Sequence, residues 1–131
     1  MAMKQYRLAV RNALLFTRAA LKHRQRIRIV TLLLDTGSTY TILSWEVLVS
    51  LQLDPATSLT RRSVMTASGL LMLPEVEVEE FHTLGQRVER FPVLTHTVPL
   101  GSQVDGVVGM NFLRQFEMAL HFKQALIQLE S

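Results

Sequence analysis

The chain has 131 residues, a formal net charge of +3, 48% hydrophobic residues and 19% charged residues. That length accommodates one domain, and the composition is that of a globular protein rather than a disordered one. The chain has no cysteine, which excludes disulfide frameworks, thiolate metal sites and thiol nucleophiles and indicates a reducing compartment. No apolar run reaches the roughly 18 residues that a membrane-spanning helix needs, and Arg18 interrupts the run that a secretory signal would require. We therefore expect a single domain over residues 1–131, with no membrane span and a cytoplasmic location.

Positive charge is concentrated at the amino terminus, where eight basic residues precede the first acidic residue, Asp35. Three interpretations are open: an Arg-rich organelle transit peptide, a phosphate-binding surface for nucleic acid, or solvent-facing positions on edge strands. The basic residues alternate with apolar ones, and no set of aromatic residues for base stacking accompanies them. We favour the third interpretation and expect no nucleic-acid partner. The eight residues are Lys4, Arg7, Arg11, Arg18, Lys22, Arg24, Arg26 and Arg28.

The segment before Asp35 favours strands. Tyr6–Val10 alternates loosely, Leu14–Thr17 begins a second candidate strand, and the cluster Lys22–Gln25 is typical of a turn. Arg26–Leu34 begins with alternating arginine and isoleucine and ends as a continuous apolar run, as in a strand that enters the core from an exposed edge. A helix over residues 8–22 is the alternative, because Ala, Leu and Arg favour helices.

Short elements and turn signals alternate after Asp35. Ser44 is placed to cap a short helix over residues 45–51. Val64–Leu73 predicts a hairpin with its tip near Ser68 and Gly69. In Val76–Glu79 the valines are expected to point inward and the glutamates outward.

The last third of the chain continues this pattern. Gly85 marks a turn before a strand over residues 88–94, and Asn111 is placed to cap a helical turn that ends at Arg114. A final strand or hairpin is expected over residues 118–129. Many short strands separated by regular turn signals predict a closed all-β fold.

The strongest chemical signal is Asp35-Thr36-Gly37-Ser38, at the end of the apolar run. A carboxylate at the end of a buried strand is partly desolvated, which favours the sharing of a proton. Gly37 permits a sharp turn, Ser38 is placed to donate a hydrogen bond to the carboxylate, and Thr36 offers a free hydroxyl. An ordinary strand-to-turn Asp that caps its own loop is the alternative. The pattern favours Asp35 as a catalytic residue.

A second segment, about seventy residues downstream, strengthens this interpretation. It consists of Val107-Val108-Gly109 followed by Asn111-Phe112-Leu113. Together with the Asp35 loop it resembles the retropepsin family of aspartic peptidases, in the compact single-domain form found among bacteria. The first loop is similar to the catalytic loop of that family. The second segment is similar to the strand, glycine and helix that lie behind the loop.

The resemblance implies a closed acid-protease barrel with a flap hairpin and one or two short helices. It also implies a homodimer that binds a peptide or protein substrate, in which Thr36 of each chain steadies the loop of the other. No cofactor and no metal are expected. The flap would comprise Thr66, Ala67, Ser68 and Gly69, and the substrate floor or helix element Val107, Val108, Gly109 and Asn111.

Two features depart from the family pattern. Thr39 and Met110 occupy positions where retroviral members often carry an acidic residue and an arginine that pair, so that ion pair is absent here. Gly69 is the only glycine of the predicted flap, whereas viral flaps are rich in glycine. Both differences concern substrate binding and the locking of the dimer rather than the catalytic chemistry.

Peptide hydrolysis of this kind needs two carboxylates that share a proton, since two acidic groups about 3 Å apart do not both ionise. The sequence contains one Asp-Thr-Gly. Asp105 is followed directly by Gly106 without an intervening hydroxyl residue, so we interpret Asp105 as a turn residue. The second carboxylate must then come from a second copy of the chain, with both Asp35 residues at a two-fold axis.

The sequence therefore predicts an aspartic endopeptidase that activates a water with a pair of Asp35 carboxylates. A dimeric peptide-binding module of the same fold, with weak or no activity, is the first alternative. A basic nucleic-acid binder is the second. A metal site is not expected, because no two histidines stand at the helical spacing of metal ligands. The histidines are His23, His82, His96 and His121.

Overall fold

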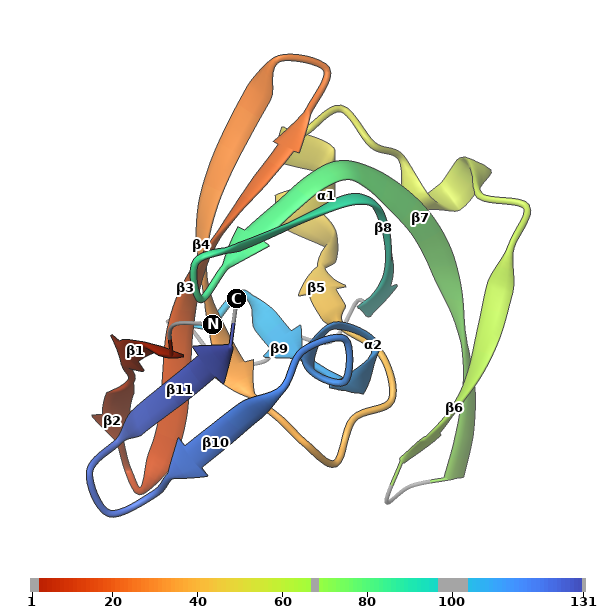
Figure 1. Cartoon of the computed structure of the whole chain (residues 1–131). Helices are drawn as coiled ribbons and strands as arrows, with labels where there is room; N and C mark the ends of the chain where they lie inside the picture. The colour runs from red at the N-terminus through yellow and green to blue at the C-terminus, as the bar shows by residue number, and fades with distance from the viewer. Residues whose placement is uncertain (1–2, 67–68, 97–103, 131) are drawn as a thin grey trace.

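The computed structural model describes residues 3–66, 69–96 and 104–130, and in this part the chain is mostly strand (Figure 1). The strands are β1 (Met3–Arg7), β2 (Ala9–Arg11), β3 (Leu14–His23), β4 (Arg26–Leu34), β5 (Ile42–Ser44), β6 (Arg61–Thr66), β7 (Gly69–Thr83), β8 (Gln86–His96), β9 (Gly106–Val108), β10 (Met118–His121) and β11 (Leu126–Glu130). The helices are α1 (Trp45–Ser50) and α2 (Met110–Leu113), and a 3₁₀ turn spans Pro55–Thr57.

The larger sheet curves round until its strands meet. Its order is β2-β3-β4-β9-β5-β8-β7-β6, and an additional pairing of β3 with β7 closes it. β4 and β9 run parallel, with Leu34 opposite Val108. The smaller sheet, β1-β11-β10, brings the two ends of the described chain together (Figure 1). The predicted all-β fold is confirmed, as are the hairpins of β6 with β7 and of β10 with β11.

The helix considered for residues 8–22 is wrong, because most of this segment is strand β3. β3 pairs with β4 along one edge and with β7 along the other. Its residues Ala19 and Leu21 are buried in the core. Pairing on both edges and burial of alternate side chains outweigh the helix propensity of Ala and Leu.

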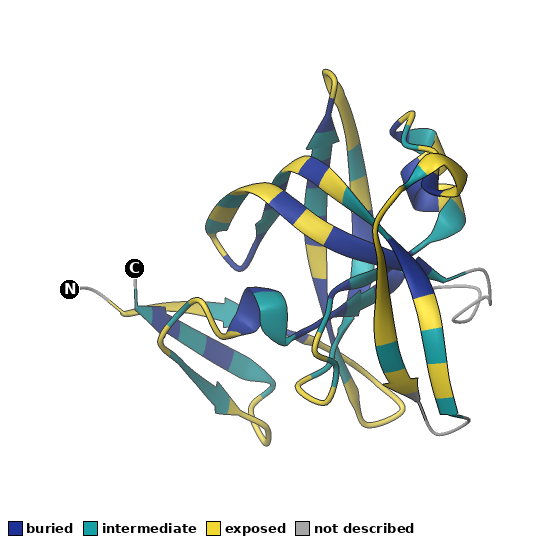
Figure 2. Ribbon diagram, turned by 90° about the vertical axis from the view of Figure 1, so that its right-hand side faces the viewer, coloured by how far each residue is buried: buried dark blue, intermediate teal, exposed yellow. Residues whose placement is uncertain are grey.

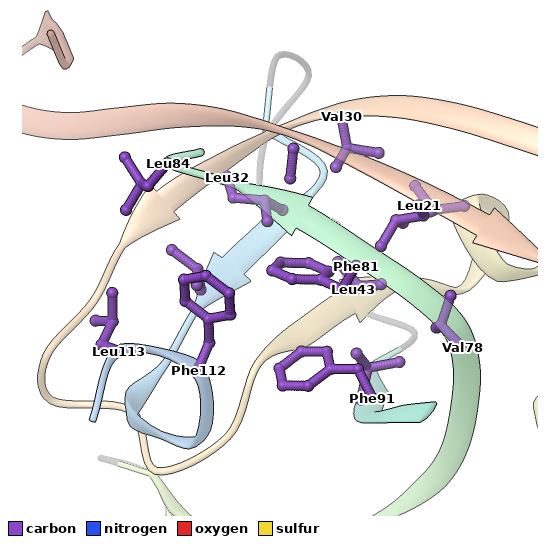
Figure 3. Close-up of a cluster of buried hydrophobic side chains, with 14 of the residues drawn as sticks. Leu21, Val30, Leu32, Leu43, Val78, Phe81, Leu84, Phe91, Phe112 and Leu113 are labelled. Atoms are coloured by element: carbon purple, nitrogen blue, oxygen red, sulfur yellow. The ribbon is translucent and has the colours of Figure 1, made fainter. Parts of the chain in front are cut away.

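The core is built from alternate residues of these strands together with both helices. Figure 3 shows side chains from the strands and from α2. Phe81 of β7, Phe91 of β8 and Phe112 of α2 form an aromatic cluster. The ring centroid of Phe81 lies 4.7 Å from that of Phe91 and 5.2 Å from that of Phe112. Since Phe112 lies in α2, this cluster fixes the short helix against the sheet.

Local signals in the sequence predicted several element boundaries. The Ser44 side chain accepts a hydrogen bond from the backbone N–H of Val47 and caps α1, as expected. In β7, Val78 is buried while Glu77 and Glu79 are exposed, so the predicted alternation is confirmed. The resulting bands of buried and exposed residues are visible along the strands in Figure 2.

The amino-terminal basic residues lie on strands and turns at the surface. Six of the eight are exposed, and Lys22 and Arg28 are half-buried. This agrees with solvent-facing positions, but Arg18 and Lys22 lie on β3, which is paired along both edges, rather than on an edge strand as expected. Within the described residues, no helix is long and apolar enough to cross a membrane. The same part of the chain contains no group of three or more His, Cys, Asp or Glu that could hold a metal ion.

Glu80 is the centre of an ion-pair cluster on the outer face of the sheet. Its carboxylate lies 3.0 Å from Nε of Arg87, 2.9 Å from Nε2 of His82 and 3.8 Å from Nζ of Lys22. The hydrogen bonds from Arg87 and then His82 lower the pKa of Glu80 from 4.5 to about 2. A carboxyl group whose pKa is lower in the folded state stabilises the fold above its unfolded pKa, and this contribution disappears as the pH falls.

The free energy of unfolding of the wild type should fall as the pH is lowered from 4.5 to about 2, the ordinary pKa of Glu80 and its pKa in the folded state. We expect this fall to be smaller in Glu80→Gln, which has no carboxylate to protonate. Thermal or urea unfolding of wild type and variant over this interval measures the effect. Glu79→Gln is the matched control, because Glu79 is a neighbour on the same strand and forms none of the ion pairs of the described residues. Parallel curves for wild type and Glu80→Gln would contradict the expectation.

Candidate active site

Asp35 is the first residue after β4 and is held by the parallel strand beside it. Its backbone N–H donates to the carbonyl oxygen of Val108 at 3.0 Å, which extends the pairing of β4 with β9 by one residue. Its side chain is half-buried. The sheet therefore delivers a carboxylate to the end of the barrel while leaving it open to solvent.

The loop after Asp35 folds back onto the carboxylate. The N–H of Gly37 donates to Oδ1 of Asp35 at 3.0 Å, and the N–H of Ser38 donates to the Asp35 carbonyl oxygen at 3.2 Å. The expected hydrogen bond from the Ser38 hydroxyl to the carboxylate is absent from the structure. That hydroxyl donates instead to the carbonyl oxygen of Tyr40 at 2.7 Å, because the loop turns and brings this carbonyl within reach. A backbone N–H thus orients the carboxylate, and Ser38 stiffens the loop.

Gly109 allows the chain segments to pack closely behind the loop. A Cβ at this position would lie 2.3 Å from the carbonyl oxygen of Tyr40 and 2.7 Å from that of Ser38. No side chain fits in that space. The close approach lets the N–H of Met110 donate to the Ser38 carbonyl oxygen at 2.7 Å. The glycine and the start of α2 therefore support the loop.

Asn111 supports the same loop from within α2. The prediction that it caps this helix is wrong, because Gly109 is the N-cap residue and Asn111 lies inside the helical turn. The Asn111 Oδ1 accepts from both the N–H and the hydroxyl of Thr41, at 2.9 and 2.8 Å, and its Nδ2 donates to the Pro92 carbonyl oxygen at 3.0 Å. A single amide side chain thus connects α2 to the loop and to β8.

The β6–β7 hairpin and the Asp35 loop enclose a cleft of about 520 Å³. Asp35, Gly37, Ser38 and Val107 line it, so the structure brings these four expected residues together. Val108 and Gly109 are buried behind the cleft. Val64 and Met65, from the hairpin predicted over Val64–Leu73, also line it, and Thr39, Tyr40, Ile42 and Ser63, which the sequence did not single out as lining residues, complete it.

The expected flap falls only partly within the described residues. Thr66 and Gly69 form the last pair of the β6–β7 ladder, whereas Ala67 and Ser68 lie outside the described residues. The hairpin residues that line the cleft are instead Ser63, Val64 and Met65, on the β6 strand before the expected tip. Val64 and Met65 belong to the predicted hairpin Val64–Leu73, and only Ser63 lies just before it.

Thr36 is exposed and borders an apolar hollow of about 460 Å³ on the other side of the loop. Val10, Leu14 and Phe122 contribute to this hollow and have 56%, 50% and 72% of their surface exposed. We call the surface formed by the exposed Thr36, Val10, Leu14 and Phe122 and the half-buried Leu120 the Thr36 surface. Its hydrophobic character is typical of an interface.

Asp105 is bound into the sheet. Its Oδ2 accepts from the N–H of Thr31 at 2.9 Å, and its own N–H donates to the Thr31 carbonyl oxygen at 2.9 Å. Its carbonyl oxygen accepts from the N–H of Ser44 at 2.8 Å. Asp105 therefore joins the end of β9 to β4 and β5 instead of forming the turn that the sequence suggested.

Comparison with known proteins agrees with this architecture. A family model of aspartyl proteases matches residues 25–112, more than half of the chain. The chain belongs to the aspartyl protease family. Its structure is similar to the crystal structure of a retropepsin-like aspartic protease from Rickettsia conorii, with a TM-score of 0.72 and 18% sequence identity. The match covers 98% of this chain and 91% of that chain, so the fold is retropepsin-like. A search of curated proteins finds no match.

Within this aspartyl protease domain, the Asn111 amide should contribute measurably to stability. Asn111→Ala leaves the buried Thr41 N–H without its acceptor, and we expect the free energy of unfolding to fall by roughly 1–3 kcal/mol. Asn111→Asp keeps an acceptor and should cost less. Urea unfolding measures both, with Gln115→Ala, an exposed residue of the next turn, as the control. A loss for Asn111→Ala no larger than that of the control would contradict the assigned role.

Proposed function

We propose that this protein is a homodimeric aspartic endopeptidase in which Asp35 from each subunit supplies one of the two catalytic carboxylates. The observation that carries the proposal is the position of Asp35 in an open cleft, where the Gly37 N–H orients its carboxylate. Asp105, the other candidate from the sequence, is occupied by its hydrogen bonds to Thr31. A second catalytic carboxylate therefore requires a second chain.

The proposed reaction follows from two carboxyl groups that share one proton. The ionised group removes a proton from a water molecule, and the oxygen of that water attacks the carbonyl carbon of the peptide. The protonated group donates its proton to the carbonyl oxygen, which gives a tetrahedral gem-diol. Collapse of this intermediate transfers a proton to the leaving amine, breaks the C–N bond and returns the pair to its starting state.

The substrate would bind in an extended conformation between the β6–β7 hairpin and the Asp35 loop. An extended peptide can form strand-like hydrogen bonds to backbone groups at the edges of the cleft. Tyr40, Ile42 and Val107 provide an aromatic and aliphatic lining, and Ser63 and Thr39 add hydroxyl groups. This lining suits a peptide substrate, and the proposed reaction of two carboxylates and a water uses no cofactor. A cytoplasmic location remains a prediction.

The Thr36 surface is the structural feature that favours a second subunit. In a two-fold dimer, each Thr36 hydroxyl would reach the loop of the partner, and the exposed Val10, Leu14 and Phe122 side chains would be buried around the axis. β10 is an outer strand of the small sheet, and its sequence Met-Ala-Leu-His carries no Lys, Arg, Asp or Glu that would discourage pairing. β1, the opposite edge, carries Lys4 and Arg7.

Asp35→Asn tests the chemistry and the shared site together. Asn is nearly isosteric with Asp, so the fold should survive while cleavage of a mixed peptide library at about pH 4–7 is abolished. Refolding wild type with a growing excess of Asp35→Asn should then reduce the activity of the wild-type chains, because mixed dimers hold a single carboxylate. The measurement is cleavage by mass spectrometry.

Three outcomes can be separated in this experiment. Equal cleavage by wild type and variant would overturn the assignment of Asp35. Undiminished wild-type activity in a mixture shown to contain mixed dimers would overturn the shared site. A wild-type dimer that binds peptides and cuts none would favour the peptide-binding module instead.

A charge on the Thr36 surface should prevent dimer formation. Phe122→Asp places a carboxylate at the proposed interface, so we expect monomers in analytical ultracentrifugation and a large loss of activity. Leu59→Asp is the matched control, because Leu59 is fully exposed and lies outside the Thr36 surface. A Phe122→Asp variant that remains dimeric and active would show that the subunits meet elsewhere.

A further inference from the structure

The β3–β4 hairpin is strongly basic, and most of its charge is uncompensated. Residues 18–28 include five basic residues and no acidic one. In the described part of the chain only Lys22 of these five forms an ion pair, with Glu80. The four others are Arg18, Arg24, Arg26 and Arg28. The proposed peptidase reaction uses none of these residues.

The hairpin also exposes aliphatic side chains close to its tip. The turn at Arg24 and Gln25 projects from the body of the molecule and is exposed (Figures 1 and 2). Ile27 is 65% exposed and Ile29 is 50% exposed. Ile27 lies opposite Lys22 in the ladder, so these two side chains share the outer face of the hairpin. Arg26 and Arg28 alternate with these isoleucines along β4 and lie opposite His23 and Leu21, so the projecting tip carries aliphatic side chains on one face and arginines on the other.

A shallow groove of about 560 Å³ continues from Ile29 across the same outer face. Cross-strand pairing places Ala20, His82 and Arg87 in one row beside Ile29, over β3, β7 and β8. Arg18 also lines the groove. His82 and Arg87 are already paired with Glu80, so among the described residues the groove offers an apolar part and one cation without an ion pair, Arg18.

We infer that the β3–β4 hairpin docks this protein onto an anionic membrane surface. The tip meets the membrane end-on, so that the arginines on one face bind lipid phosphates and Ile27 on the other enters the boundary between head groups and acyl chains. Charge complementarity selects an anionic partner. The exposed isoleucines select lipid over nucleic acid, because single-stranded nucleic acids are bound by aromatic stacking and residues 18–29 contain no Phe, Tyr or Trp.

The docking surface and the Asp35 cleft lie at opposite ends of β4. This strand has nine residues, so the tip of the hairpin is roughly 30 Å from Asp35. A membrane that contacts the tip therefore leaves the cleft accessible to a peptide. The inference does not depend on peptidase activity, and Asp35→Asn should bind membranes as wild type does.

Vesicle sedimentation tests the inference directly. One set of vesicles contains phosphatidylcholine alone, and the other contains equal parts of phosphatidylcholine and phosphatidylglycerol. We expect binding only to the second set, with an affinity that falls as salt is added. Each basic residue near an anionic surface strengthens binding about fivefold, so a variant with Arg24, Arg26 and Arg28 changed to Gln should bind on the order of a hundredfold more weakly.

Two further variants separate the contribution of the aliphatic side chain to vesicle binding from that of the positive charges. Ile27→Ser keeps every charge and should weaken vesicle binding roughly tenfold, because it removes the aliphatic group that would enter the membrane. The control variant changes Lys4, Arg7 and Arg61 to Gln; it loses the same net charge elsewhere and should bind more tightly than the hairpin variant. Equal loss in both triple variants would overturn the assignment to the hairpin.

Binding to an oligonucleotide tests the alternative partner, a nucleic acid. Fluorescence anisotropy with a labelled single strand measures binding under the same salt conditions. Binding to the oligonucleotide without binding to anionic vesicles would overturn the inference in favour of a nucleic-acid surface. Vesicle binding unchanged by Ile27→Ser would overturn the membrane-insertion part, and absence of vesicle binding would overturn the whole.

Discussion

The contact between Gly109 and the loop after Asp35 constrains the whole site. Because position 109 has no side chain, the carbonyl groups of Ser38 and Tyr40 lie against its backbone. The first N–H groups of α2 then reach this loop, and Met110 binds Ser38. A larger residue at position 109 would push the loop away from α2 and change the direction of the Asp35 carboxylate. The geometry of the carboxylate thus depends on a glycine far away in the sequence.

The same loop presents two different faces. Its inner face, with Asp35 and Gly37, lines the cleft under the β6–β7 hairpin. Its outer face, with Thr36, meets an apolar hollow bordered by exposed Leu14 and Phe122. An isolated chain would leave this second face in water at a cost in free energy. The proposed dimer would bury this face and supply the second carboxylate at the same time.

The sequence predicted the elements whose signals are local. Ser44 caps α1 and Val78 is buried, since a capping residue and strict alternation depend only on near neighbours. It failed where distant segments decide the outcome. The hydrogen bonds of Asn111 to Thr41 join segments 70 residues apart, and those of Ser38 depend on how the loop folds back. Leu14–His23 contains residues with high helix propensity, but its pairing with β4 and β7 makes it a strand.

β4 explains how one short domain can carry two separate surfaces. Its first half alternates arginine with isoleucine on a hairpin that only β3 supports, so its side chains remain available to a partner. Its second half becomes continuously apolar where β9 joins it, and this buried half positions Asp35. The change in hydrophobic pattern within nine residues records a change in environment from solvent to core. A rigid strand between the two ends would hold the catalytic cleft at a fixed height above any surface that the hairpin binds.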